Sequence, residues 1–386
     1  MDTQRPILII GTGLAGYLLA KALRALGNPQ PLCLVTESHG FFYSKPLLST
    51  ALTRQKTPDT LPTDTAEAMA QALDARIRTN TRITHLDTPQ RIAYADTTAI
   101  PYDRCVFACG ATPNLPTIPG ATASDLITIN QLEDYRSFCN LLPSIKKITI
   151  LGAGFVGCEF AHDLITNGYE VDLIDTAPHP LSRLLPSEIG TALQEKLAET
   201  GIRWHMQQTI TQLQRSDNGY RLTCADDTAI DTDLILSAIG LRPNLALAKA
   251  ADIDTHTGIV VDAGLRTSDA HCYALGDCAE IFGRTRYFIA PLRRCVATLA
   301  HNLTHPDTPT TITYPPMPVS LKTPSCPLVI ATPAPEVENP HWVITGSQAD
   351  RKALCYDAQK QLCGFVLMGD CVQQRAELTK TLSAQF

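Results

Sequence analysis

The sequence of 386 residues has no Cys-x-x-Cys motif, although it contains thirteen cysteines. The closest pairs are Cys105/Cys109 and Cys272/Cys278, so neither a thioredoxin-like redox pair nor a zinc site is predicted. Several cysteines, such as Cys158, lie within apolar runs, where a free thiol behaves as a small hydrophobic side chain. The pattern indicates reduced thiols and a cytoplasmic protein that binds no metal.

Long apolar runs and an excess of positive charge are also missing. Outside the glycine-interrupted N-terminal segment no run of 18 apolar residues exists, so neither a transmembrane helix nor a stable membrane association is expected. The N-terminus has no basic leader and no cleavage site. The formal net charge of −6 gives the molecule no nucleic-acid-binding footprint. Hydrophobic and charged contents of 44% and 18% are typical of a globular protein.

A glycine-rich turn stands near the N-terminus. The apolar run 6–10 leads into it, and an Ala/Leu-rich helix is expected to follow as far as Leu26. The turn contains Gly11, Gly13, Leu14, Ala15 and Gly16. In such a strand–turn–helix unit, the three glycines allow the tight turn, the close approach of a pyrophosphate and the packing of helix on strand. The next apolar run is followed by Glu37, 21 residues after Gly16, where an acid that binds ribose is expected. The sequence therefore predicts a dinucleotide site.

The same pattern occurs a second time, with first glycines 141 residues apart. The apolar run 147–151 leads into a turn and helix start that contain Gly152, Gly154, Phe155, Val156, Gly157 and Glu159. The strand expected over 169–174 ends at Asp175, which would accept a hydrogen bond from a ribose 2′-hydroxyl and repel a 2′-phosphate. The second site is therefore predicted to prefer NADH to NADPH, a preference that His179 and Arg183 would weaken.

Other segments place polar residues or glycine at the ends of apolar runs. They contain Ser44, Lys45 and Pro46 in a loop that opens a short helix, Cys109 and Gly110, Gly240, and Gly276 with Asp277. In a parallel sheet such loops line the ligand crevice. A hairpin-like excursion is expected over 76–100, and a helix over 291–303. Residues 304–318, rich in Thr and Pro, are predicted to be a linker to a small, mostly β domain with a closing helix.

Together the paired glycine motifs, Cys109-Gly-Ala-Thr-Pro113, Gly240-x-x-Pro243 and Gly276-Asp277 resemble the two-dinucleotide-domain flavoprotein reductases. At finer grain, 43–49 and 321–328 resemble bacterial rubredoxin reductases of the FAD-dependent pyridine nucleotide-disulfide oxidoreductase superfamily, without its redox disulfide. The resemblance covers nearly the whole chain. It implies an α/β fold with two Rossmann-like dinucleotide-binding domains and a small C-terminal α+β domain. The implied division is 1–114 and 242–315 for FAD, 115–241 for NAD, and 316–386 for the C-terminal domain.

The resemblance also implies roles for individual residues. Lys45 corresponds to a lysine beside the flavin, Glu159 to the acid that pairs with it, and Asp277 to the aspartate that bonds the ribityl chain. Lys322, with Thr323, corresponds to a segment near the isoalloxazine ring. Cys109 stands where the family usually has threonine, a difference expected to alter packing more than chemistry.

The activity implied is hydride transfer from NADH to FAD, followed by single-electron transfer to rubredoxin, with an alkane hydroxylase as the system served. Residues 38–53 contain no cysteine, so electrons would leave directly from the flavin. Ferredoxin or flavorubredoxin remain alternative acceptors, and a flavin-binding regulator without turnover is an alternative of another class. An acidic carrier would dock on a basic patch, for which the candidates are Lys45, Arg284, Arg286, Arg293, Arg294 and Lys322. The alternative is that these residues are scattered surface charges.

Overall fold

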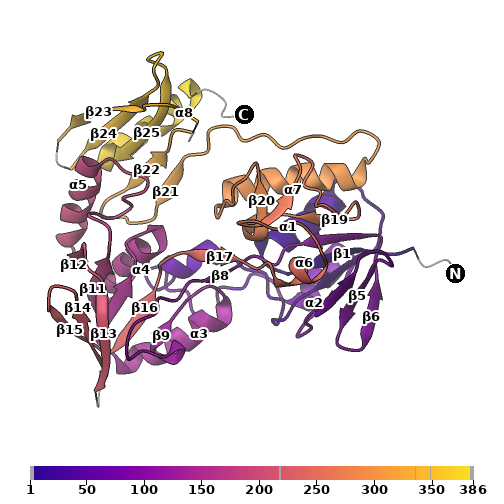
Figure 1. Cartoon of the computed structure of the whole chain (residues 1–386), viewed down its shortest axis with the longest axis horizontal. Helices are drawn as coiled ribbons and strands as arrows, with labels where there is room; N and C mark the ends of the chain where they lie inside the picture. Colours follow the sequence, from indigo (N-terminus) through magenta and orange to yellow (C-terminus); the bar gives the residue numbers. More distant parts are fainter. Residues whose placement is uncertain (1–3, 217–218, 335, 348, 383–386) are drawn as a thin grey trace. The chain divides into compact units, whose positions relative to one another are not determined.

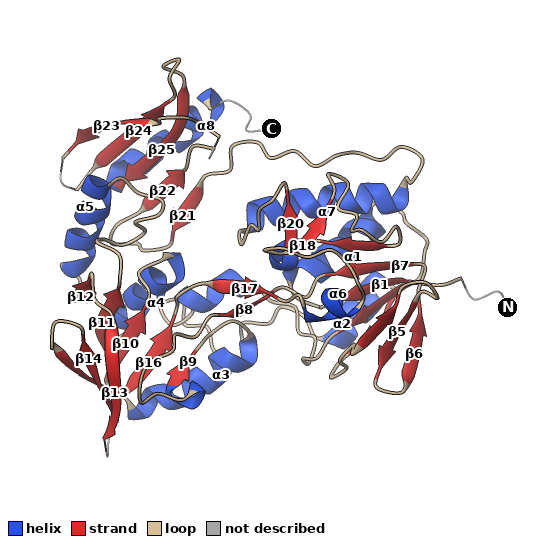
Figure 2. Cartoon of the chain, in the orientation of Figure 1, coloured by secondary structure: helices blue, strands red, loops and turns tan. Residues whose placement is uncertain are grey.

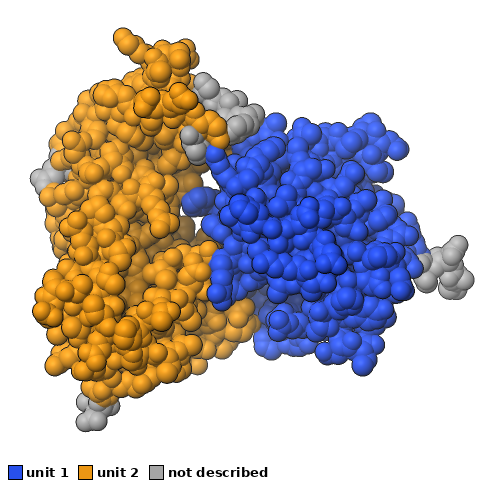
Figure 3. Space-filling view, viewed as in Figure 1, with its two compact units in different colours: residues 1–45, 60–112, 242–314 blue, residues 46–59, 113–241, 315–386 orange. Residues whose placement is uncertain are grey.

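The computed structural model describes residues 4–216, 219–334, 336–347 and 349–382. The chain divides into two compact units, each built from segments that are separate in the sequence (Figure 3). The first unit consists of residues 1–45, 60–112 and 242–314, and the second of residues 46–59, 113–241 and 315–386. The chain crosses between the units within β8 (Ala111–Pro113) and β17 (Leu241–Pro243), at Lys45/Pro46, at 59/60 and at 314/315.

The first unit is built on a parallel five-stranded sheet of order β19-β7-β1-β2-β3 (Figure 1). Its strands are β1 (Ile7–Ile10), β2 (Leu32–Val35), β3 (Ala75–Arg78), β7 (Arg104–Phe107) and β19 (Cys272–Ala274). Every residue of β1, β2 and β19 is buried, as expected for strands whose two faces are both covered. The helices are α1 (Leu14–Ala25), α2 (Ala66–Leu73), α6 (Ala246–Ala250) and α7 (Ile289–Thr304), and α1 packs on α7 (Figure 2).

Smaller sheets complete the first unit. Strands β4 (His85–Asp87), β5 (Ile92–Ala95) and β6 (Thr98–Pro101) form an antiparallel sheet, and β18 (Ile259–Val261) pairs with β20 (Ala279–Ile281). The excursion predicted over 76–100 is therefore only partly right. Residues 75–78 join the parallel sheet beside β2, a pairing between segments far apart in the chain that no local pattern signals.

The second unit contains a parallel sheet of order β12-β11-β10-β16-β9. Its strands are β9 (Leu126–Ile127), β10 (Lys147–Leu151), β11 (Glu170–Asp175), β12 (Arg203–Met206) and β16 (Leu234–Ser237). Its helices are α3 (Leu132–Leu141), α4 (Phe155–Thr166) and α5 (Ser187–Ala198). The predicted repetition of strand, glycine turn and helix is thus present in both units.

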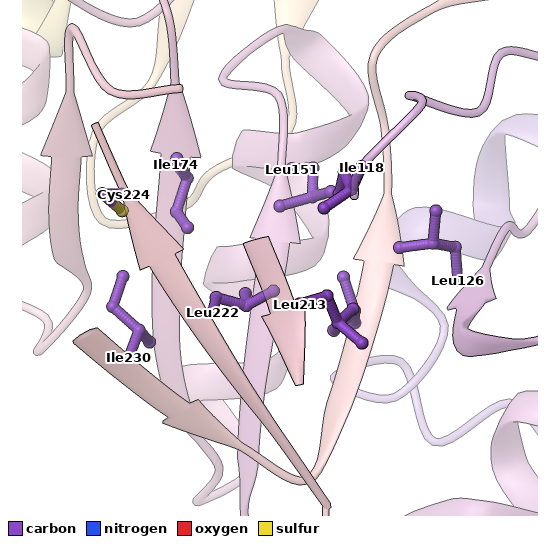
Figure 4. Close-up of a cluster of buried hydrophobic side chains, with 9 residues drawn as sticks. Ile118, Leu126, Leu151, Ile174, Leu213, Leu222, Cys224 and Ile230 are labelled. Atoms are coloured by element: carbon purple, nitrogen blue, oxygen red, sulfur yellow. The ribbon is translucent and has the colours of Figure 1, made fainter. Parts of the chain in front are cut away.

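An antiparallel sheet covers part of this parallel sheet. It consists of β13 (Ile210–Ser216), β14 (Gly219–Cys224) and β15 (Ala229–Thr232). Leu213 of β13 and Leu222 of β14 point toward Leu151 of β10 and Ile174 of β11 (Figure 4). This buried cluster fixes the ends of β10 and β11, which carry the second glycine turn and the acid after it.

The C-terminal part of the second unit is an antiparallel sheet of order β21-β22-β25-β24-β23. Its elements are β21 (Val319–Leu321), β22 (Leu328–Ala331), β23 (His341–Gly346), β24 (Arg351–Tyr356), β25 (Leu362–Met368), η5 (Gly369–Gln374) and α8 (Arg375–Thr381). Val329, Phe365 and Leu367 form a core on which Leu378 of α8 packs. The predicted fold class, two dinucleotide-binding Rossmann-like sheets and a small C-terminal α+β domain, is confirmed. Within the described ranges, every helix is too short or too polar to traverse a bilayer.

One buried carboxylate on β11 of the second parallel sheet makes the stability depend on pH. Burial would raise the pKa of Asp172, but hydrogen bonds from His205 (2.8 Å) and Arg203 (2.7 and 3.0 Å) lower it to about 2. Because the folded pKa lies below the ordinary value of 3.8, this contribution is complete above that value and is lost as the pH falls toward 2. It amounts to about 2 kcal/mol.

We therefore expect Asp172→Asn to lower the free energy of unfolding at pH 6 by about 2 kcal/mol, and the gap from wild type to narrow below pH 4. Urea unfolding at several pH values measures this. A gap that is constant from pH 6 to pH 3 would contradict it.

Candidate functional site

Four of the predicted segments follow strands that are parallel neighbours in the first unit. Gly11 directly follows β1, Glu37 lies just beyond β2, Cys109 and Gly110 lie beyond β7, and Gly276 lies beyond β19. Because the carboxyl ends of parallel strands meet at one edge of a sheet, these segments share that edge. The structure therefore brings the predicted FAD-binding residues of this unit together.

The turn between β1 and α1 has the geometry that a dinucleotide requires. Gly11 has φ +116°, and a Cβ there would overlap the carbonyl oxygen of Ala108. A Cβ on Gly16 would overlap the carbonyl oxygen of Gly11, so this glycine lets α1 approach the strand. At Gly13 no described atom lies within 4 Å of the place a Cβ would take. The turn is thus tightly packed against the protein at Gly11 and Gly16, and has free space at Gly13. This space suits a pyrophosphate bound at the start of the helix.

The start of α1 and the end of β19 approach each other. A Cβ on Gly276 would lie 3.0 Å from the Cβ of Ala15, the second residue of α1. Gly13 is the N-cap residue of α1 and has no side chain with which to cap it. The first backbone N–H groups of the helix, including those of Leu14 and Ala15, are therefore available to an anion.

Lys45 and Asp277 form an ion pair beside this edge. The Lys45 Nζ lies 3.8 Å from the Asp277 Oδ2, and the two side chains are 36% and 26% exposed. Burial raises the pKa of Asp277, and the positive charge of Lys45 opposes that rise. Lys45 is the first residue of η1 (Lys45–Thr50), the predicted short helix, and half-buried Ser44 precedes it.

Two further predicted residues of the first unit have defined partners. The Glu37 carboxylate lies 3.4 Å from Arg82, and both side chains are about 70% exposed, which leaves the acid accessible to a ribose. The Cys109 carbonyl accepts a hydrogen bond from Asn244 (2.8 Å), and its thiol is hydrogen-bonded to Cys278, which raises the pKa of Cys109 well above its ordinary value. Cys109 therefore acts as part of the packing, not as a reactive thiolate.

The second unit repeats the turn geometry between β10 and α4. Gly152 has φ +103°, and a Cβ on Gly157 would overlap its carbonyl oxygen. A Cβ on Gly154 would have no described atom within 4 Å. Phe155 and Val156 begin α4, and Val156 is 46% exposed at this open end. Gly240 follows β16, a parallel neighbour of β10, with φ +103°.

Asp175 ends β11 directly beside this turn. Its Oδ2 accepts a hydrogen bond from the Ala153 N–H (2.6 Å) and its Oδ1 one from the Ala177 N–H (2.9 Å). The carboxylate is thus held at the turn where a ribose is expected. His179 is buried, with Nδ1 3.0 Å from the Pro180 carbonyl oxygen, so it packs inside the loop, whereas Arg183 is exposed.

We expect Asp175→Asn to lower the ratio of kcat/KM for NADH to that for NADPH by about tenfold or more, because the charge that repels a 2′-phosphate is lost while an oxygen acceptor remains. Steady-state kinetics with both nucleotides measure the ratio. An unchanged ratio would show that another residue sets the preference.

Glu159 of α4 is the centre of a buried polar network. It is 4% exposed, and its Oε2 accepts hydrogen bonds from Ser49 Oγ (2.5 Å) and Lys322 Nζ (2.9 Å). Its Oε1 accepts one from the Lys322 backbone N–H (3.1 Å), and Lys322 Nζ also donates to the Pro46 carbonyl (2.7 Å). The resemblance implied a pair between Lys45 and Glu159. In the second unit the ion-pair partner of Glu159 is Lys322.

Four of the predicted basic residues lie within 284–294, in the segment before α7 and in the first turns of that helix. The Arg286 guanidinium lies 4.3 Å from the ring centre of Tyr314, and Arg294 donates to the Thr313 carbonyl (3.2 Å). Arg293 and Arg294 are exposed, and Arg284 is partly buried. Phe282, Tyr287 and Phe288 of the same segment are between 37% and 49% exposed.

Three residues of the second unit were not predicted from the sequence as site residues. They are Ser49, Asp163 and Asn167, which join α4 to the segment after Lys45. The signal available for Asp163 and Asn167 is their spacing, four and eight residues after Glu159 on the same helix face.

Comparison with known proteins agrees with this geometry. Residues 5–302 match the family described as "Pyridine nucleotide-disulphide oxidoreductase", and residues 311–382 match the "Rubredoxin binding C-terminal domain". The chain is 36% identical over 382 residues to the "Rubredoxin-NAD(+) reductase" of Alcanivorax borkumensis, covering 99% of both chains. It is 35% identical over 381 residues to the "Nitric oxide reductase FlRd-NAD(+) reductase" of Pectobacterium atrosepticum, again covering 99% of both.

A solved structure has the same fold. The ferredoxin reductase for the CYP199A2 system from Rhodopseudomonas palustris is similar to this structure with a TM-score of 0.87 and 27% identity, over 98% of this chain and 95% of that one. Two glycine turns of dinucleotide-binding geometry and full-length similarity therefore lead to one assignment. The chain belongs to the pyridine nucleotide-disulphide oxidoreductase family and carries its rubredoxin-binding C-terminal domain.

Proposed function

We propose that the protein is an NADH-dependent rubredoxin reductase with FAD as its bound cofactor. The observation that carries this proposal is the combination, in one chain, of two open glycine turns and a matched rubredoxin-binding domain. The acids after the two turns, Glu37 and Asp175, suit the riboses of FAD and NADH. We further propose a cytoplasmic location, which the thirteen free thiols favour.

FAD would be held at the sheet edge of the first unit. The start of α1 would bind the pyrophosphate, and the partly exposed Asp277 carboxylate would accept hydrogen bonds from the ribityl hydroxyls. Lys45, 3.8 Å from that carboxylate, would balance its charge and supply a cation beside the flavin. When bound, the flavin would accept two electrons from the donor and release them one at a time. The protein residues position the flavin and stabilise its charge, and none of them needs to act as an acid–base catalyst.

NADH would bind at the turn of the second unit. The open space at Gly154 and the start of α4 suit its pyrophosphate, and Asp175 suits its adenine-side ribose. Glu159 lies in the second turn of the same helix and holds Lys322, so the NADH-binding helix and the C-terminal domain share one ion pair. We propose that this pair fixes the orientation of Lys322 beside the NADH-binding helix.

The electron acceptor would be a small acidic iron protein. We propose that it docks on Arg284, Arg286, Arg293 and Arg294, beside the exposed aromatic side chains of 282–288 in the same unit, with Lys45 and Lys322 as further basic contacts. Such docking is electrostatic, so turnover with rubredoxin should fall about tenfold between 50 and 500 mM salt. Reduction of a small uncharged acceptor such as a quinone serves as the control and should change little. Salt-independent turnover with rubredoxin would exclude the patch.

The acceptor is tested directly by steady-state assay. Purified protein is given NADH and equal concentrations of rubredoxin, a [2Fe–2S] ferredoxin or a flavorubredoxin, and the three values of kcat/KM are compared. The proposal expects rubredoxin to be preferred. Preference for flavorubredoxin would favour the second candidate, a flavorubredoxin reductase, which the 35% identity to the Pectobacterium protein supports. Supply of electrons to an alkane hydroxylase is a proposal that rests on the resemblance alone.

A further inference from the structure

One face of helix α4 carries three polar side chains at intervals of four residues. They are Glu159, Asp163 and Asn167, the last being the C-cap residue of the helix. Residues four apart lie above one another on a helix, so the three form a single stripe. All three bond to the segment 46–53, which follows Lys45 in the chain.

Asp163 accepts two backbone N–H groups of this segment. Its side chain is 2% exposed, its Oδ1 accepts the Thr53 N–H (2.8 Å) and its Oδ2 accepts the Leu52 N–H (3.0 Å). The Thr53 hydroxyl is hydrogen-bonded to it as well. A buried carboxylate is costly unless its oxygens are hydrogen-bonded, so this one holds two consecutive peptide groups in place.

The attachment extends along the segment. Asn167 Nδ2 donates to the Thr53 hydroxyl (3.2 Å), and from α3 the Tyr135 hydroxyl donates to the Lys56 carbonyl (3.2 Å). Arg136 and Asp59 form an ion pair at 2.8 Å. Residues 46–59 are therefore part of the second unit through side-chain contacts, although in sequence they lie far from its other segments.

The stripe lies on the proposed NADH-binding helix and holds the segment that follows Lys45 in the chain. At its start, α4 opens at Gly154, where NADH is proposed to bind; the segment that the stripe holds begins one residue after Lys45, which is proposed to lie beside the flavin. We propose that Asp163 is a positioning residue for hydride transfer, which holds segment 46–53 on the NADH-binding helix and so sets the placement of Lys45 and Ser49. Hydride transfer is sensitive to displacements of about 1 Å, so loosening this attachment lowers its rate. The inference rests on the proposed function.

The test compares two carboxylates that each accept two backbone N–H groups, Asp163 with both of its oxygens and Asp134 with one. Asp163→Asn is expected to break one of the two bonds, because an amide has one acceptor and brings an N–H group toward the other donor. Asp134→Asn is the matched control, since the Asp134 Oδ2 accepts the Asn130 N–H (2.9 Å) and the Gln131 N–H (3.0 Å) at the start of α3. Thr53→Val is a milder variant, which removes only the hydroxyl that contacts Asp163 and Asn167.

The measured quantity is the limiting rate of flavin reduction by NADH in anaerobic stopped-flow, per bound FAD. We expect a decrease of about tenfold or more for Asp163→Asn and about threefold for Thr53→Val, with the apparent Kd for NADH and the rate for Asp134→Asn within about twofold of wild type. Equal rates for Asp163→Asn and Asp134→Asn would overturn the inference. If Asp163→Asn does not retain FAD, a wild-type rate for Thr53→Val overturns it. A wild type that NADH does not reduce would refute the proposed function instead.

Discussion

Replacement of Gly13 by alanine should cost the protein its FAD, whereas replacement of Gly154 should leave FAD bound and weaken only NADH. Both glycines are N-cap residues in allowed backbone conformations, with φ −68° and ψ −172° at Gly13 and φ −77° and ψ −172° at Gly154. At neither position does a described atom lie within 4 Å of an added Cβ. The protein therefore accommodates each methyl group, and only a bound pyrophosphate would meet it.

The two variants are controls for each other, because they make the same change at equivalent points of the two turns. We expect Gly13→Ala to weaken FAD binding, and Gly154→Ala to raise the KM for NADH, by about tenfold or more, which is at least about 1.4 kcal/mol. Flavin absorbance per protein and steady-state kinetics measure the two effects, and circular dichroism checks that the fold is retained. Loss of FAD in Gly154→Ala, with full retention in Gly13→Ala, would reverse the assignment of the sites.

Neutralising Glu159 should both destabilise the second unit and slow flavin reduction. Glu159→Gln leaves the Lys322 ammonium without the carboxylate that lies 2.9 Å away, although Ser49 keeps an acceptor. Loss of one partner of a buried pair costs about 3–5 kcal/mol. We expect about 2 kcal/mol here, because 34% of the Lys322 side chain is exposed and water replaces part of the interaction. Reduction by NADH should be about tenfold slower, because Lys322 is no longer oriented.

A double-mutant cycle with Lys322→Met separates the pair from its surroundings. The free energies of unfolding in urea are measured for the two single variants and the double variant. We expect a coupling energy of about 1 kcal/mol or more, so that the double variant loses less stability than the sum of the two single losses. Strict additivity of the two losses would mean that the observed ion pair does not contribute to stability.

Local patterns were enough to predict the two cofactor turns. Gly11 and Gly152 follow short apolar strands, and helices begin after them, so the required φ values of +116° and +103° are signalled by neighbouring residues alone. Asp175 could also be predicted locally, because only one helix and one strand separate it from the turn in the sequence. For these features sequence and structure agree because the interactions are close in the chain.

Contacts between distant segments were not predictable in this way. Ser49 and Lys322 lie 110 and 163 residues from Glu159, and no local pattern says which of several lysines meets that acid. Strand β13 was missed because only Leu213 of its seven residues is buried, so it has no alternating pattern. The attachment of 46–59 to α3 and α4 depends on backbone groups of Leu52 and Thr53, which carry no side-chain signal.

The central claim is that electrons pass from NADH through one bound FAD to rubredoxin. A double-mixing stopped-flow experiment tests it most directly: the holoprotein is first reduced anaerobically with one equivalent of NADH and then mixed with oxidised rubredoxin. The account predicts rapid bleaching of the flavin absorbance in the first step and, in the second, its return together with the loss of the rubredoxin absorbance. Absence of bleaching, or a reduced flavin that rubredoxin does not reoxidise, would contradict the account.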